Sequence, residues 1–110
     1  MGVTHTVLFQ FKAELSADDV KAAFARFLAL KDTCIHATTG ERYIISLKGG
    51  KDNSPENMQG GLTHGVVAEF ASAEDRDYYI TTDPVHQEFM KFIGGLLEKA
   101  VVVDFSDGVY

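Results

Sequence analysis

The chain has 110 residues, 45% of them hydrophobic and 24% charged, which predicts one soluble globular domain over residues 1–110. Its net charge of −6 comes from 16 acidic and 10 basic residues without a basic stripe, which excludes a nucleic-acid-binding surface. No apolar run is long enough to cross a bilayer, so we expect no membrane partner.

The first expected elements are a strand and a helix. Within residues 3–11, one parity is apolar apart from His5 and the other is mixed, which is typical of a strand with one buried face. Ser16 can accept hydrogen bonds from free backbone N–H groups and is followed by two aspartates, so a helix begins there. An apolar stripe predicts that this helix covers residues 17–32.

Two further strands flank a polar loop. Residues 43–48 are rich in Tyr and Ile and predict the second strand, and residues 63–70 predict the third. His64 shares its parity with the apolar residues of that third strand. The loop over residues 49–62 contains four glycines, and its segment 54–56 fits a short turn of helix with proline at the first position.

The last third predicts two helices and a strand. Ser72 begins a short helix that continues through Tyr79, and Pro84 suits the first turn of another helix. The apolar stripe of that second helix extends to Leu97, although two glycines weaken its last turns. Residues 101–105 predict the final strand.

This order of elements predicts an α+β, ferredoxin-like βαββαβ fold, with an antiparallel four-stranded sheet and helices on one face. We expect the first and third strands to lie side by side and run parallel, which would make His5 and His64 neighbours under the helices. The opposite face carries Leu8 and Val67 and is half apolar, so we expect it to pack against a second copy as a homodimer.

Several short segments carry a resemblance to a known family. They are THTVLFQFK (residues 4–12), GLTHG (61–65), FAS (70–72), DYYI (77–80), DPVH (83–86) followed by Phe89, and VDF (103–105). In this order and spacing they resemble the stress-responsive A/B barrel domain (Dabb) family, a branch of the dimeric α/β barrels, over essentially the whole chain.

The resemblance implies candidate site residues. The family includes plant stress proteins and a plant polyketide cyclase of the olivetolic acid cyclase type, which closes an aromatic ring by intramolecular aldol condensation. That cyclase uses a helix histidine as general base and a nearby tyrosine, and two strand histidines line its pocket. The matching histidines here are His86 on the helix and His5 and His64 on the strands.

The matching tyrosine depends on where a one-residue difference in length lies. Tyr79 occupies the position if the extra residue falls within residues 81–83, and Ile80 occupies it otherwise. An aromatic residue of the cyclase's first helix is matched by Phe27.

Three histidines directed into one apolar layer predict a small pocket with acid–base chemistry. We assign catalysis to His86 and Tyr79, because a neutral imidazole is a competent base near pH 7 and a phenol can stabilise an oxyanion. The expected substrate-binding residues are His5, His64, Val7, Phe9, Phe27, Val66 and Phe89. Each histidine taken singly is more simply explained as a packed, hydrogen-bonded core residue, and it is the three together that favour a pocket.

We expect no metal and no cofactor. The three histidines offer three nitrogens, as some zinc sites do, but they lack a closely spaced ligand motif, and no acidic residue is expected on their face. Cys34 follows a helix and is more simply a structural thiol than a nucleophile.

Two function classes remain open. One is a cofactor-free cyclase or lyase acting on a polyketide-like or other small carbonyl compound, and the other is a non-catalytic stress-responsive or small hydrophobic ligand-binding protein. The lone cysteine excludes an intrachain disulfide, and the first strand lacks a cationic leader, so we expect a cytoplasmic protein.

Overall fold

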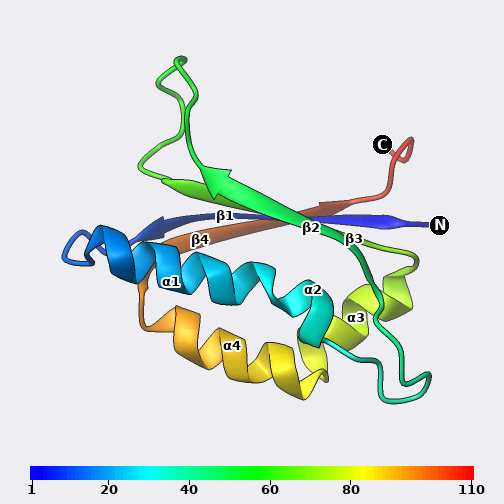
Figure 1. Cartoon of the computed structure of the whole chain (residues 1–110). Coiled ribbons are helices and arrows are strands. Elements are labelled where there is room, and N and C mark those ends of the chain that lie inside the picture. The colour runs from blue at the N-terminus through cyan, green and yellow to red at the C-terminus, as the bar shows by residue number, and fades with distance from the viewer.

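The computed structural model describes all 110 residues as a four-stranded sheet with every helix on one face (Figure 1). The strands are β1 (Val3–Phe11), β2 (Ile44–Lys51), β3 (His64–Phe70) and β4 (Leu97–Phe105). The helices are α1 (Ala17–Leu28), α2 (Leu30–Thr33), α3 (Ala73–Thr81) and α4 (Pro84–Gly94). The strand order is β2-β3-β1-β4 with antiparallel neighbours, which confirms the ferredoxin-like α+β prediction.

The expected parallel pairing of β1 and β3 is wrong, because the two strands pair antiparallel. The helical crossover between β1 and β2 makes these two strands parallel. The β2–β3 hairpin then reverses the chain, so β3 runs antiparallel to β1. His5 therefore lies opposite Ala68, and His64 lies opposite Phe9. Four residues along a strand correspond to about 13 Å, so the two histidines occupy opposite ends of the sheet.

The start of α1 follows from its capping residues. The Ser16 hydroxyl accepts a hydrogen bond from the Asp19 N–H, and the Asp19 carboxylate accepts one from the Ser16 N–H. This reciprocal pair satisfies two backbone donors that a helix start leaves free. The predicted helix over residues 17–32 is confirmed in position, with an interruption at Ala29 that divides it into α1 and α2.

Three local expectations differ from the structure. Residues 54–56 form only a turn, because this polar segment has no apolar face to pack as a helix. Helix α4 ends at the glycine pair, and Leu97 begins β4 opposite Phe11 instead of extending the helical stripe. Strand β2 continues through two glycines that we expected in the loop.

The hydrophobic core lies between the sheet and the helices. Its buried members are Phe9, Phe11, Ala23, Phe27, Leu30, Cys34, Tyr43, Ile44, Val66, Ala68, Phe70, Tyr79, Phe89 and Ile93. Helix α1 packs over β2, and α3 packs over β1 and β3, while β4 lies at the sheet edge. Val102 of β4 faces the helix side, opposite Val7, yet it is 56% exposed, so the helices leave β4 uncovered.

The other face of the sheet carries no helix. Leu8, Val101, Val103 and Phe105 lie exposed on it in neighbouring register positions of β1 and β4. The β2–β3 loop and the end of the chain both rise from this face (Figure 1). No helix of the protein is long and apolar enough to cross a membrane.

Gly49 provides a test of the close approach between β2 and β3. A Cβ atom at this position would lie 2.6 Å from the Gly65 carbonyl oxygen and 2.7 Å from a Val66 methyl group. We expect Gly49→Ala to lower the free energy of unfolding by about 1–3 kcal/mol, as overpacking does, measured by chemical denaturation. Gly50→Ala is the matched control, since its Cβ meets nothing within 4 Å. Equal destabilisation by both substitutions would contradict this account.

Candidate functional site

His86 lies in the first turn of α4, between that helix and α3. Asp83 caps the helix by accepting a hydrogen bond from the Val85 N–H at 2.9 Å. Pro84 fits the first turn because it lacks an N–H, and an N–H at that position would have no partner within the helix. The His86 ring is buried, and its Nδ1 lies 2.7 Å from the Tyr79 carbonyl oxygen. A carbonyl oxygen only accepts, so Nδ1 carries the proton and Nε2 keeps its lone pair.

Tyr79 covers one face of the His86 ring. The two rings stack with centroids 3.6 Å apart and planes inclined by 22°. Tyr79 is almost fully buried, and burial raises the pKa of its phenol, so the hydroxyl stays protonated at neutral pH. Of the two residues matched to the family tyrosine, Tyr79 is therefore the one in contact with His86, whereas Ile80 packs at the edge of the core.

The protonation of His86 is controlled by burial. Desolvation lowers the pKa of His86 to about 4, although the hydrogen bond to the Tyr79 carbonyl opposes this change. The nearby His5 lowers the pKa further, and Asp83 raises it. The imidazole is consequently neutral at physiological pH and available as a proton acceptor through Nε2.

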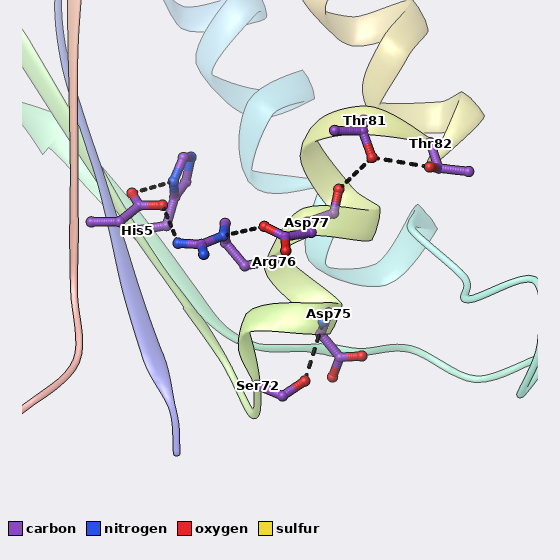
Figure 2. A network of polar contacts seen from close by, with 8 residues as sticks. His5, Ser72, Asp75, Arg76, Asp77, Thr81 and Thr82 are labelled. Carbon is purple, nitrogen blue, oxygen red and sulfur yellow. Dashed lines mark hydrogen bonds and ion pairs between the residues drawn. The ribbon is translucent and has the colours of Figure 1, made fainter.

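His5 joins this site from β1 through a network of charged groups. Its ring meets the edge of Tyr79 with centroids 5.9 Å apart, and its Nδ1 lies 2.7 Å from an Asp104 carboxylate oxygen. The other Asp104 oxygen accepts from Arg76 at 2.8 Å, and Arg76 also donates to Asp77 (Figure 2). Our expectation that no acidic residue shares the histidine face is wrong, because β4 places Asp104 directly opposite His5.

His64 belongs to a different environment at the far end of the same face. Its ring stacks parallel to Phe9 at 6.0 Å and packs edge-on against Phe11 at 5.0 Å, with Phe24 of α1 beside it at 5.3 Å. Burial, followed by the positive charge of Lys51, lowers the pKa of His64. His5 and His64 do face the helices, as their parity predicts, but the structure does not bring them together.

Comparison with known proteins assigns the family. The family model described as the stress-responsive A/B barrel domain matches residues 3–107. The chain belongs to this family. It is 29% identical over 104 residues to the stress-response A/B barrel domain-containing protein HS1 of Arabidopsis thaliana, covering 94% of this chain and 88% of HS1. It is 26% identical over 107 residues to At5g22580 of the same plant, covering 94% of this chain and 85% of that protein.

Solved structures share the fold of this A/B barrel domain. The crystal structure of At3g17210 from Arabidopsis thaliana is 28% identical with a TM-score of 0.85, covering 98% of this chain and 97% of that one. The hydroxynitrile lyase of Passiflora edulis is 24% identical with a TM-score of 0.84, covering 99% and 96%. A dimeric ferredoxin-like protein from Jannaschia sp. CCS1 is 17% identical with a TM-score of 0.77, covering 96% and 99%. The last two likenesses show the fold alone.

The remaining expected binding residues of this A/B barrel domain lie in its packed core. Phe27 and Phe89 contact each other with centroids 4.6 Å apart, Phe9 stacks on Phe27, and Val66 is buried beneath them. Val7 is half-buried and lies beside the exposed helix-side face of β4.

No principal concavity of the surface reaches His5, Tyr79 or His86. The largest, of about 590 Å³, lies on the outer sheet face beside Leu8 and Val67, beneath the β2–β3 loop. The expectation of one internal cavity shared by three histidines is therefore wrong.

A metal site built on three histidines does not fit this geometry. His64 lies away from the other two, and no group of three or more His, Cys, Asp or Glu side chains is arranged to hold a metal ion. Cys34 is fully buried, and burial and then the Asp83 carboxylate raise the pKa of its thiol to about 12. A protonated, inaccessible thiol is not a nucleophile.

Sequence reasoning missed three residues that surround the site. Asp83 and Asp104 entered the sequence analysis only as parts of the DPVH and VDF segments, and Arg76 received no assignment. Asp104 had a detectable signal, because antiparallel pairing places residues near the end of β4 opposite residues near the start of β1. Asp83 and Arg76 act through contacts between distant elements, which local sequence patterns do not encode.

The lowered pKa of His86 predicts a pH-dependent stability. Unfolding returns the imidazole to its ordinary pKa of 6.5, so the unfolded chain binds the extra proton first as pH falls. The stabilisation from a neutral His86 is complete above pH 6.5 and is lost as pH falls towards 4. The difference corresponds to about 3 kcal/mol.

We expect His86→Gln to flatten this part of the curve, measured by chemical denaturation at intervals between pH 7 and pH 4. Other acid-sensitive groups are common to both proteins, so the difference between the two curves isolates His86. Superimposable curves would contradict a depressed His86 pKa.

Proposed function

We propose that this protein is a cofactor-independent lyase or cyclase that acts on a small, mainly apolar carbonyl compound, with His86 as the general base. The observation that carries the proposal is the hydrogen bond between His86 Nδ1 and the Tyr79 carbonyl. It leaves Nε2 unprotonated in an apolar surrounding, which is the form of imidazole that abstracts a proton.

The resting basicity of His86 suits a reaction that develops negative charge. A pKa of about 4 makes the imidazole a weak base in the closed protein. An enolate or alkoxide forming beside the ring favours the imidazolium, so the basicity of His86 rises as the proton is transferred. The base is thereby matched to an anionic intermediate on the substrate.

Tyr79 and His5 supply the complementary polar groups. The phenol of Tyr79 remains protonated because burial raises its pKa, so it can donate a hydrogen bond to a substrate oxygen. His5 is held by Asp104, which Arg76 holds in turn, so its imidazole has a fixed orientation. We assign His5 to positioning the polar end of the substrate.

We propose that the substrate reaches this site along the inner face of β4. The helices leave the inner face of β4 uncovered, and the exposed Val102 lies across from Val7 and on the same face as Asp104. An apolar substrate approaching here meets Val7 before His5. Phe27 and Phe89 contact each other with centroids 4.6 Å apart, so a ligand that reaches them must displace part of this packing.

The similarity to a hydroxynitrile lyase supports a catalytic function in this fold. That enzyme from Passiflora edulis shares the architecture over nearly the whole chain. Architecture alone does not transmit an activity, so the proposal depends on the residues around His86.

A binding function without catalysis is the second candidate. His5, Tyr79 and His86 are each at most 7% exposed, which is equally what a packed, stable core requires. The names of the Arabidopsis relatives place them in the stress response. Absence of turnover with every carbonyl substrate tested, together with saturable binding of small apolar ligands, would favour this candidate.

Substitution of the histidines tests the catalytic proposal. We expect His86→Ala to lower kcat/KM by about 10²–10⁴-fold, because the general base is lost. His5→Ala should have a smaller effect through misplacement of substrate. His64→Ala is the matched control, since that ring lies at the opposite end of the sheet. Rates are compared only among variants with unchanged melting temperature, and near-full activity of His86→Ala would end the assignment.

We further propose that the protein is a homodimer joined through the outer sheet face. Solved relatives of the same fold are described as dimeric. The exposed apolar side chains of β1 and β4 form a continuous surface that a monomer leaves in water. In a two-fold symmetric dimer, this apolar surface of one copy covers the same surface of the other copy.

A charge placed on this face should separate the two copies. We expect light scattering to give the wild type twice the 12.1 kDa chain mass at micromolar concentration, and Leu8→Asp to shift it towards a single chain. Met90→Asp is the control, because Met90 is similarly exposed but lies on the helix layer. A dimer that survives Leu8→Asp, or a monomeric wild type, would remove this proposal.

We assign the protein to the cytoplasm. The support is its single, fully buried cysteine, which is compatible with a reducing compartment and forms no disulfide.

A further inference from the structure

Asp83 is a buried carboxylate that the mechanism above does not use. Its side chain is 0% exposed, and it lies between α3 and α4 at the cap of the helix that carries His86. Burying a carboxylate is costly unless hydrogen bonds satisfy it. Its hydrogen-bond partners therefore indicate what the residue holds in place.

The two oxygens of Asp83 bind two different parts of the fold. One accepts from the Val85 N–H at 2.9 Å and from the His86 N–H at 3.5 Å, and these groups belong to the first turn of α4. The other accepts from the Tyr43 hydroxyl at 2.5 Å, just before β2. The Cys34 thiol, which stays protonated, lies beside the same carboxylate. Donors thus surround the group, and it joins the start of α4 to the start of β2.

This anchor acts directly on the orientation of His86. The histidine lies in the same first turn, and its Nδ1 bonds the Tyr79 carbonyl of α3, to which the Asp83 N–H also ties the turn by donating to the Tyr78 carbonyl at 2.9 Å. A loosened turn separates Nδ1 from the carbonyl and frees the proton to move to Nε2. The nitrogen that serves as base would then be blocked.

We infer that Asp83 is a positioning residue for His86: its carboxylate ties the first turn of α4 to Tyr43 and so keeps the His86 proton on Nδ1 and the lone pair on Nε2. The inference rests on the proposed function of His86 as a base. Its test needs no substrate, so a failure of the proposed function and a failure of this inference are distinguishable.

The test is nitrogen NMR of the full chain labelled at histidine, at pH 7, which reports which ring nitrogen carries the proton. We expect the wild type to show His86 protonated on Nδ1. Loss of an aspartate cap typically corresponds to a fivefold change in a local equilibrium, from about 1 kcal/mol. Asp83→Ala should therefore increase the Nε2-protonated fraction of His86 about fivefold. Tyr43→Phe, which keeps the cap and removes only the anchor, should increase it by at least about twofold, the low end for loss of one hydrogen bond.

Two matched controls separate positioning from general loosening. Ser16→Ala removes an equivalent cap from α1, and Tyr78→Phe removes a tyrosine hydroxyl that accepts only from the exposed Ala37 N–H. Both should leave the His86 signals unchanged. If Asp83→Ala does not fold, Tyr43→Phe decides the question. A wild-type proton distribution in the folded Asp83 and Tyr43 variants, or an equal change in the controls, would overturn the inference.

Discussion

The arrangement of this protein depends on β1, which is hydrogen-bonded on both sides by antiparallel neighbours. That double register places Asp104 on one side of His5 and the small Ala68 on the other, so the imidazole has a carboxylate partner and room against Tyr79. A slip of β4 by one residue against β1 would turn Asp104 to the outer face and remove the carboxylate partner of His5. The position of His5 and its carboxylate partner is therefore set by backbone pairing.

The helix-covered layer has two chemically distinct ends. At one end His86, Tyr79 and His5 combine buried rings with charged partners, and α3 and α4 both contribute. At the other end His64 is half-buried against phenylalanines and lines the largest surface concavity. The burial that keeps His86 neutral also makes its protonation costly, so the protonation state of this one side chain is linked to stability at low pH.

Most of the architecture followed from local patterns. Strand β1, the cap at Ser16 and the start of α4 at Pro84 each have a strong local cause, and each lies where the pattern predicts. The predictions that were wrong concern residues whose structure depends on pairing with another strand. Strand β2 continues through Gly49 because this residue pairs with Val66 of β3, and the close approach there leaves no room for a side chain. Leu97 joins a strand because it pairs with Phe11.

The amino-acid sequence by itself determined which residues face the helices, since parity along a strand and periodicity along a helix are local properties. It identified His5, His64 and His86 as residues of one layer. Only the tertiary structure decided that His5 and His86 share a site while His64 does not, because the direction and register of β3 against β1 depend on how the whole chain turns. The same is true of Asp83 and Asp104, whose partners Tyr43 and His5 are distant in the chain and adjacent only in the fold.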